Sequence, residues 1–551
     1  MPSHQRTEYH FNQLNGDQET KTFDHRTEDN EAQTVWKKPS VFRTKISQYV
    51  ANLSCHLLAL DLCMAFAFTT IVNAALMDST GKDDLTLNSV QASWLGSIAY
   101  ICQPAGSVMS GFIVEFFGRK WSMIIVNLPF LIGWILYSVS HSVAMLYTTN
   151  VILGVGIGFM EAPILTYVAE TCQPELRAIL TALLGITAQI SFFVDYLLGT
   201  VTTWRTAAAI STALPIITAL YVTQMPESPI WLLSRGREKE AERSLCWLRG
   251  WVTPDVVKQE FNELVLYNSK TNTTGAIQLN TIESSQVILD QAYTIEYRQK
   301  YDITHLRGMD AQEYGEESHC SVDLWKEMIR PPTLRPLLLV IPFFFLYQLG
   351  GMAAIRPYMV HVFREFGLHD VAEWVAVGSA VIGIIGAAAL VGTVNWLGKR
   401  LISLISFMGN AVACVLLAVY ILLVLRPGSE GNSMAWIPLT LIVIFSFFSS
   451  VLFEVPWTML SEIFPFRTRG IASGLSAAMC YIFLFIATKT YLDLEKSLEL
   501  YGVFLLFGAI NLVGFIFVYF RMPVMEGRTL IEIEEYFSGQ TKGFVKNVPR
   551  K

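Results

Sequence analysis

Long apolar stretches alternate with short polar segments along most of the chain. An apolar α-helix of about 20 residues crosses a hydrocarbon core that is about 30 Å thick. The pattern therefore predicts six membrane-spanning helices, a long polar segment, and six more spans. We expect the spans near residues 55–77, 91–113, 121–140, 147–168, 178–199, 204–223, 335–363, 371–394, 401–425, 435–460, 470–490 and 500–521.

The same alternation divides the chain into five regions. Residues 1–50 are polar and lack the apolar core of a cleavable signal peptide, so we expect an N-terminal tail. Two six-helix bundles, at 51–223 and 335–521, flank a hydrophilic loop at 224–334 that is expected to contain short helices at the membrane face. Residues 522–551 are expected to form a C-terminal tail. The predicted fold class is an all-α membrane protein.

The composition supports a membrane protein and excludes several other classes. Hydrophobic residues make up 52 % of the 551 residues and charged residues 16 %, against about 25 % in soluble proteins. This balance excludes a disordered chain, and the net charge of -6 argues against nucleic-acid binding. The sequence contains no phosphate-binding glycine loop, metal-ligand cluster or nucleophile beside a base. We therefore expect neither an enzyme nor a bound cofactor.

Positively charged residues in the short loops indicate how the spans are oriented. Cytoplasmic loops of membrane proteins carry an excess of Lys and Arg. If the spans alternate in direction, these residues concentrate on the side that also bears both termini and the long loop. They are Arg119, Lys120, Arg177, Lys399, Arg400, Arg467 and Arg469. Both termini and the loop at 224–334 are therefore predicted to be cytoplasmic.

Charged motifs in the first half of the chain return in the second half in the same order. The corresponding motifs are Gly118-Arg119-Lys120 with Gly398-Lys399-Arg400, Glu170 and Arg177 with Glu462 and Arg469, and Pro226-Glu227 with Pro523 and Glu526. Parallel six-helix repeats are typical of transporters that move two halves about a central binding site. The repeat therefore predicts a transporter.

Further short motifs accompany these charges: Ser93-Trp94, Gly154-x-Gly156-x-Gly158, Trp204-Arg205 and Pro456-Trp457. As a set, the motifs resemble those of the sugar porters of the major facilitator superfamily, and among these the facilitated glucose and trehalose transporters of insects. The resemblance implies the major facilitator fold, with twelve transmembrane helices arranged as two six-helix bundles. It also implies facilitated diffusion of a small sugar, trehalose-like or hexose-like, by alternating access. The carrier is expected to be a monomer in the cell membrane.

Four residues are expected to contact the solute. In sugar porters, amide side chains hold the sugar hydroxyls and an aromatic face lies against the ring. Gln189, Gln348 and Trp457 stand at matching positions, and Tyr358 is the fourth candidate. An uncharged amide both donates and accepts hydrogen bonds, and within lipid it is costly unless it is used. The alternative is that Gln348 caps a helix break at Gly350-Gly351 and that Trp457 is an interfacial anchor.

Other positions depart from the family pattern. Gly350 and Ala353 stand where the family has a serine and an asparagine, and Cys480-Tyr481 replaces an asparagine–tryptophan pair. Each neutral hydrogen bond that is lost from a binding site costs roughly 0.5–1.5 kcal/mol. We therefore expect either weak binding of a sugar or a different solute.

Charged residues at the predicted cytoplasmic helix ends are candidates for an inner gate. Ion pairs there would close the cavity when it faces outward and separate when it faces inward. Exposed pairs worth about 0.2–1 kcal/mol suit a switch between states of similar free energy. The alternative is that the positive charges only set the topology. The candidate gating residues are Glu115, Arg119, Glu170, Arg177, Arg400, Glu462 and Arg469.

Several ionisable residues lie within predicted spans, namely Asp61, Asp195, Arg356 and Glu454. Residues of this kind usually face a cavity or a partner. We expect Asp195 and Arg356 either to pair with each other or to contact the solute, and Glu454 is a further candidate for these roles. A second hypothesis is therefore a carrier of a charged organic solute. A third is a transport-dead nutrient sensor that signals through its N-terminal tail and long loop.

Overall fold

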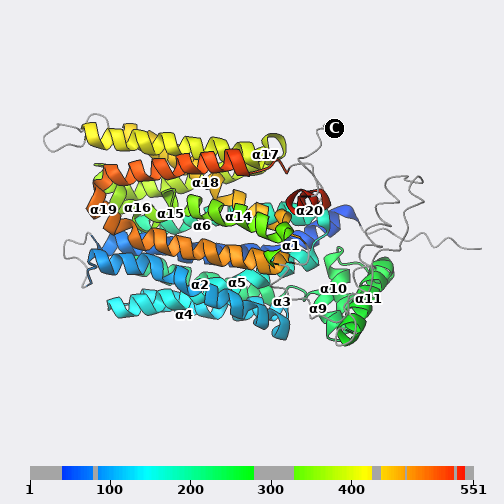
Figure 1. Ribbon diagram of the computed structural model, residues 1–551. Helices are drawn as coiled ribbons and strands as arrows, with labels where there is room; N and C mark the ends of the chain where they lie inside the picture. Colours follow the sequence, from blue (N-terminus) through cyan, green and yellow to red (C-terminus); the bar gives the residue numbers. More distant parts are fainter. Residues whose placement is uncertain are drawn as a thin grey trace, which may run out of the picture. The chain divides into compact units, whose positions relative to one another are not determined.

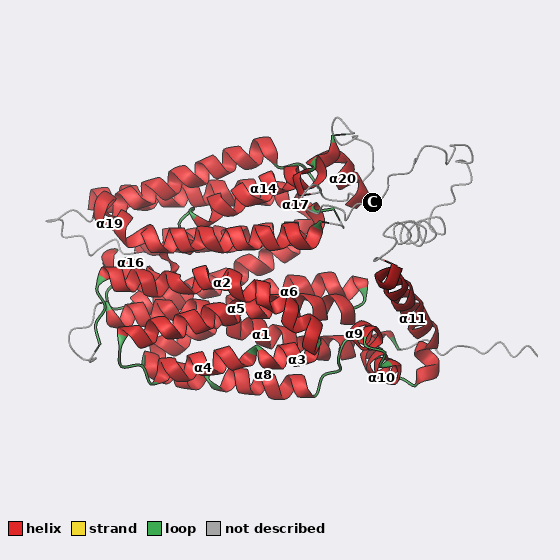
Figure 2. Cartoon of the chain, turned by 60° about the horizontal axis from the view of Figure 1, so that its bottom comes forward, coloured by secondary structure: helices red, strands yellow, loops and turns green. Residues whose placement is uncertain are grey.

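The computed structural model describes residues 40–77, 85–277, 328–424, 436–465, 468–525 and 530–539. All of these residues belong to one compact unit, Pro39–Lys551, which is distinct from Met1–Lys38. The described part of the chain is built from helices and connecting turns, with no strand (Figure 2). This confirms the predicted all-α class.

The first bundle contains six spans. Its helices are α1 (Val41–Leu76), α2 (Ser89–Phe117), α3 (Arg119–Ile125), α4 (Asn127–Ser138), α5 (Val143–Thr171), α6 (Pro174–Val201), α7 (Trp204–Ser211) and α8 (Ala213–Thr223). Two spans are each formed by a pair of consecutive helices. α3 and α4 together form the span Arg119–Ser138, and α7 and α8 form the span Trp204–Thr223.

The second bundle also contains six spans, because two of its helices are long enough to cross twice. α17 (Ala372–Val424) and α19 (Arg469–Arg521) have 53 residues each, and each contains one residue with non-helical backbone angles, Gly398 and Glu499 respectively. Since one crossing needs about 20 residues, each of these helices supplies two spans. α18 (Trp436–Ile463) crosses once.

The remaining span of the second bundle is broken near its middle. Its elements are α14 (Pro331–Gln348), α15 (Met352–Ile355), the 3-10 helix η1 (Arg356–Tyr358) and α16 (Met359–Glu365). The two parts are bent by 49°. Gly351 lies at the break with φ of +119°, and a Cβ atom there would approach the ring of Phe507 to 2.7 Å, so the position requires glycine. With this span, the prediction of two six-helix bundles is confirmed.

Short helices gather at one end of the bundles, which we call the loop end, and the opposite end is the far end (Figure 1). These helices are α9 (Pro229–Ser234), α10 (Glu238–Leu248), α11 (Pro254–Ile277) and α20 (Leu530–Ser538). Three of these short helices, α9, α10 and α11, lie within the segment 224–334. Residues 278–327 of that loop lie outside the described residues.

The first helix begins earlier than the sequence pattern predicts. α1 starts at Val41, whereas the predicted tail extends to residue 50. Thr44 Oγ1 donates a 3.0 Å hydrogen bond to the carbonyl of Arg249, and Ser47 Oγ donates a 2.8 Å bond to the carbonyl of Leu248. α1 therefore extends into the segment that the sequence pattern assigns to the tail. Its first turns are polar and are stabilised by the end of α10, so a search for apolar runs does not detect them.

The two bundles meet mainly along two pairs of helices. α2 of the first bundle packs against α19 of the second, and α6 packs against α17. Within the bundles, α2 packs mainly on α5, and α17 on α18. Figure 2 shows the two bundles one above the other, with α6 and α2 facing the second bundle. The interface between the bundles positions the candidate site.

Candidate functional site

A small cavity lies between the two bundles, lined by α6 on one side and by α15, η1, α16, α17 and α18 on the other. Its volume is about 20 Å³, which is near the space of a single water molecule. Its polar lining residues are Gln189, Tyr196, Arg356, Ser379, Ser446 and Ser450. A solute of the size of a sugar does not fit this volume, so its binding requires the cavity to widen.

Gln189 is the predicted solute-binding residue that lies directly in this cavity. Its side chain is buried, and its Nε2 atom has no hydrogen-bond partner among the described residues. Its Oε1 atom lies 2.6 Å from the position that a Cβ of Gly383 would take, so the glycine makes room for the amide. An unpaired buried amide is unfavourable by about 1–3 kcal/mol. Gln189 is thus available to a bound solute.

Gln348 and Trp457 lie beside α19 rather than beside Gln189. Gln348 Nε2 donates a 3.0 Å hydrogen bond to Cys480 Sγ, while its Oε1 atom is buried without a described partner. The ring of Trp457 packs edge-on against Phe344 at 5.3 Å and lies 6.1 Å from the ring of Tyr481. The structure therefore brings these two predicted residues together around the Cys480-Tyr481 pair.

Tyr358 takes part in closing the interface at the far end. Its side chain is 1 % exposed, and its hydroxyl donates a 2.9 Å hydrogen bond to the carbonyl of Thr488. Its ring stacks on Tyr491 at 5.3 Å, and its hydroxyl lies 3.0 Å from where a Cβ of Gly96 would be. With its hydroxyl occupied in this conformation, its contact with a solute stays a prediction.

The predicted ion pair between Asp195 and Arg356 is not formed in this structure. Both carboxylate oxygens of Asp195 are buried without a hydrogen-bond partner among the described residues. The guanidinium of Arg356 lies 4.0 Å from the centroid of the Phe192 ring instead. The pairing fails because Arg356 turns toward the cavity that Gln189 lines, whereas Asp195 is not among the residues that line it.

The other predicted intramembrane acids have different surroundings. Asp61 accepts a 2.7 Å hydrogen bond from Trp134 Nε1. Glu454 packs against α6, where its carboxyl group occupies the space that a Cβ of Gly185 would need. Its Oε1 atom is buried without a described partner. Asp61 is therefore held within the first bundle, and Glu454 lies at the interface between the bundles.

Sequence reasoning missed a further acid at the interface, Glu161 of α5. Its carboxylate accepts hydrogen bonds from Gln103 Nε2 at 3.2 Å and from Ser107 Oγ at 2.6 Å, both on α2. It also accepts one from the hydroxyl of Tyr481 on the second bundle. The signal was present, because an acid between Met160 and a proline within an apolar span is unusual.

The candidate gating residues of the first bundle form a network at the loop end. Arg119 Nη2 lies 2.7 Å from Glu170 and 3.5 Å from Glu115. Ser228 donates a hydrogen bond to the other oxygen of Glu170. Glu227 accepts hydrogen bonds from the backbone N–H groups of Arg119 and Lys120. Burial raises the pKa of the Glu227 carboxyl, and these N–H groups oppose that rise.

The remaining candidate gating residues bind backbone carbonyls at the loop end. Arg177 donates a 2.6 Å bond to the carbonyl of Ala169, Arg400 a 2.7 Å bond to Tyr519, and Arg469 a 3.2 Å bond to Phe464. The side chain of Glu462 lies outside the described residues. The contacts described for Arg119, Arg177, Arg400 and Arg469 each stay within one bundle, so among the residues that the structure describes no candidate gating ion pair joins the two bundles at the loop end.

At the far end, by contrast, polar contacts join the two bundles. Thr70 Oγ1 donates a 2.7 Å hydrogen bond to the carbonyl of Arg356, and Asn73 Nδ2 donates a 3.0 Å bond to the carbonyl of Pro357. Lys489 Nζ, which sequence reasoning also missed, donates a 2.7 Å bond to Ser93 Oγ. The interface is therefore closed at its far end.

Two six-helix bundles that meet around a polar cavity and are joined by polar contacts at the far end define a multi-pass membrane transporter with the major facilitator fold. The profile of the family described as "Sugar (and other) transporter" matches residues 17–295 and 290–537. The chain belongs to this sugar transporter family, and it is a transporter and not an enzyme.

Curated relatives come from several insects. The facilitated trehalose transporter Tret1 of Polypedilum vanderplanki is 26 % identical over 522 residues, covering 94 % of this chain and 93 % of the relative. The Tret1 of Culex quinquefasciatus is 25 % identical, covering 92 % of this chain and 89 % of the relative. The match to the Tret1 of Aedes aegypti is 26 % identical and covers 90 % of this chain but only 56 % of that relative.

Solved structures share the fold. The xylose transporter XylE from E. coli, in a partially occluded inward open conformation, gives a TM-score of 0.62 at 16 % identity, covering 89 % of this chain and 100 % of that chain. The proton:xylose symporter XylE bound to 6-bromo-6-deoxy-D-glucose gives 0.59 at 17 % identity, covering 90 % and 99 %.

Proposed function

We propose that the protein carries a small neutral sugar, trehalose-like or hexose-like, across the cell membrane by facilitated diffusion. Membership of the sugar transporter family supports this proposal, as do the relatives described as facilitated trehalose transporters. The solute passes between the two bundles, which open alternately at the loop end and at the far end.

The observation that carries the proposal is the unpaired amide of Gln189 in the cavity between the bundles. Ser379, Ser446 and Ser450 line the same cavity, and Ser446 Oγ also lacks a described partner. Neutral hydroxyl and amide groups match sugar hydroxyls, which donate and accept hydrogen bonds without carrying charge. Buried polar groups that lack partners in the empty state are satisfied when such a solute binds.

We further propose that the loop end is cytoplasmic and that both termini lie on that side. The distribution of Lys and Arg in the short loops supports this orientation. The far-end contacts of Thr70, Asn73 and Lys489 then close the outer side of the carrier. The carrier works as a monomer, because each chain contains both bundles and the cavity between them.

The proposal is tested by uptake of labelled trehalose and glucose into vesicles that contain the purified full-length protein. We expect saturable uptake that stops when the inside and outside concentrations are equal. Gln189→Ala is expected to lower kcat/KM about tenfold through loss of one amide contact. Gln224→Ala is the matched control, because Gln224 is exposed at the loop end and should leave uptake unchanged. Equal uptake by both variants would contradict the role of Gln189.

One observation favours a second candidate, a carrier of an anionic solute. Arg356 lines the cavity and makes no ion pair among the described residues. The same vesicles, tested with a labelled sugar acid, distinguish the candidates. If the vesicles take up only the sugar acid, and Arg356→Gln abolishes this uptake, the protein carries an anionic solute and not a neutral sugar. No uptake of any solute by a correctly folded protein would favour the transport-dead sensor.

A further inference from the structure

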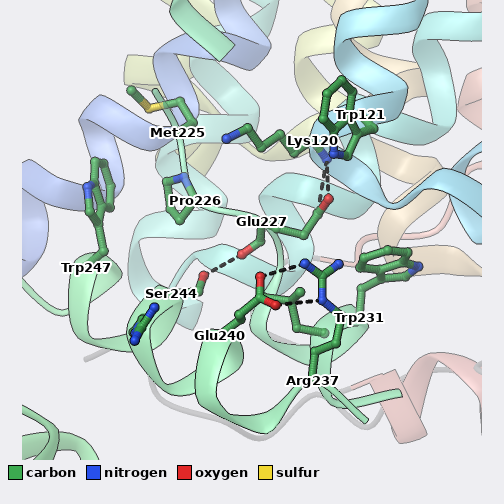
Figure 3. Close-up of a pocket in the computed structure, with 12 residues that line it drawn as sticks. Lys120, Trp121, Met225, Pro226, Glu227, Trp231, Arg237, Glu240, Ser244 and Trp247 are labelled. Atoms are coloured by element: carbon green, nitrogen blue, oxygen red, sulfur yellow. Dashed lines mark hydrogen bonds and ion pairs between the residues drawn. The ribbon is translucent and has the colours of Figure 1, made fainter. Parts of the chain in front are cut away.

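A second pocket lies at the loop end, away from the cavity between the bundles. Its volume is about 360 Å³. One side is formed by Lys120 and Trp121 of α3 and by Met225 and Pro226, which follow α8. The other side is formed by α9 and α10 (Figure 3). The pocket therefore joins the ends of two membrane spans to the helices of the loop.

Indole rings and cationic groups dominate its lining. Trp121 is 58 % exposed, although it lies in the first turn of a membrane span. Trp231 and Trp247 lie on opposite sides of Glu227 in Figure 3. Tryptophan favours the boundary between lipid and water, where its ring is buried and its N–H group stays near polar headgroups. The cationic lining residues are Lys120, Arg237 and Arg243.

The two carboxylates in the lining already have partners. Both oxygens of Glu227 accept hydrogen bonds from the backbone N–H of Lys120, at 3.0 and 3.1 Å. Both oxygens of Glu240 accept hydrogen bonds from Arg237, at 2.9 and 2.6 Å. Glu240 and Arg237 therefore neutralise each other, whereas the backbone N–H groups satisfy the hydrogen bonds of the Glu227 carboxylate without removing its charge.

The two remaining cations have donors to spare. Lys120 Nζ donates a 2.7 Å bond to the carbonyl of Thr223, but an ammonium group carries three donors. The side chain of Arg243 is exposed, and no partner of it is found in the described part of the chain. The pocket thus has an excess of positive charge together with unused N–H groups, which is the chemistry that binds a phosphate group.

The position of the pocket at the ends of two membrane spans indicates which molecule supplies that phosphate group. Lys120 and Trp121 lie at the start of the span Arg119–Ser138, and Met225 follows the end of the span Trp204–Thr223. Span ends lie at the level of the lipid headgroups. Phospholipid headgroups therefore reach the pocket directly from the membrane, and anionic lipids are concentrated in the cytoplasmic leaflet.

We propose that this pocket binds the headgroup of an anionic phospholipid. Lys120 and Arg243 bind its phosphate group, and Trp121 and Trp247 flank its glycerol and the start of its chains. The bound lipid links α10 to α3, beside the network of Arg119. The proposal goes beyond sugar transport and depends on the proposed orientation only for the leaflet that supplies the lipid.

The test compares lipid retention by the full-length protein in detergent micelles, measured by native mass spectrometry with added phosphatidylserine or phosphatidylcholine. We expect the wild-type protein to retain phosphatidylserine in preference to phosphatidylcholine. Each lost charge is expected to weaken this retention about fivefold, so Lys120→Ala with Arg243→Ala weakens it about 25-fold. Lys45→Ala with Lys258→Ala is the matched control, because both lysines are exposed and neither lines the pocket.

A conservative variant and a competition with inorganic phosphate complete the test. The conservative variant, Lys120→Arg with Arg243→Lys, is expected to keep the retention and shows that charge rather than folding is measured. Inorganic phosphate in large excess is expected to leave the lipid bound. Equal retention by the alanine variant and its control would overturn the proposal. Displacement by inorganic phosphate would also overturn it and would identify a site for soluble phosphates instead.

Discussion

The two ends of the bundles are held in different ways. At the far end, neutral hydrogen bonds from Thr70 and Asn73 reach backbone carbonyls of the opposite bundle. At the loop end, Arg119 and Glu170 form a largely buried ion pair within the first bundle, with side chains 9 % and 15 % exposed. One end therefore joins the two bundles, and the other end strengthens a single bundle.

This difference fits the demands of alternating access. A contact that must break in every cycle is best made of single hydrogen bonds, from neutral side chains or from the half-buried Lys489, because breaking them separates no buried ion pair. A contact that keeps a bundle rigid while it moves can be stronger and more buried. In this conformation, the charged motifs at the loop end thus stabilise the first bundle internally. The far-end hydrogen bonds close the interface and can separate.

The largest effect on stability is expected at the Arg119–Glu170 ion pair. Arg119→Ala leaves the carboxylate of Glu170 without its cation, and removing one partner of a buried pair costs about 3 kcal/mol. We expect a marked loss of thermal stability in detergent and of surface expression. Arg119→Lys, which keeps the charge but not the two-bond geometry, should recover part of the loss. Unchanged stability of the alanine variant would remove the distinction between the two ends.

A smaller effect is expected at the far end. Thr70→Ala with Asn73→Ala removes two hydrogen bonds between the bundles, and should shift the equilibrium toward the far-end-open state about tenfold. The measurement is labelling of Ser93→Cys by a membrane-impermeant thiol reagent, compared with the same cysteine in the otherwise unchanged protein. Thermal stability should change little. Slower labelling in the double variant would contradict the assignment of this end as the closure.

The middle of the interface offers a sharper comparison. Tyr481 donates its hydroxyl to Glu161 across the bundles, so Tyr481→Phe and Glu161→Gln should each reduce transport several-fold. In a double-mutant cycle we expect a coupling energy of about 1–2 kcal/mol between them. Additive effects on kcat/KM would show that this contact does not contribute to the cycle.

The smallest coupling is expected between Asp195 and Arg356. Because the structure does not pair them, Asp195→Asn and Arg356→Gln should have independent effects, with a coupling energy below about 0.5 kcal/mol. Transport and surface expression of the two single variants and the double variant give this energy. Recovery of the double variant above the worse single variant would mean that the pair forms in another conformation.

The sequence predicts the spans well because their length and hydropathy depend on the bilayer and not on neighbouring helices. It also places Arg119 and Glu170 among the charged residues at the helix ends, but the expected ion pairs join the two halves, whereas this pair lies within the first bundle. It does not predict which way Arg356 and Asp195 turn, because packing between helices sets their rotation. The partners of Glu161 lie on two other helices, so no local pattern indicates them.

The most direct test of the account measures both ends at once. Spin labels at His141→Cys and Asp370→Cys report the far end, and labels at Gln224→Cys and Val524→Cys report the loop end, in a variant without native cysteines. On addition of a transported sugar, the account predicts a second population in which the far-end distance grows while the loop-end distance shrinks. If both distances change in the same direction, or neither changes while uptake persists, the account of two alternating ends is contradicted.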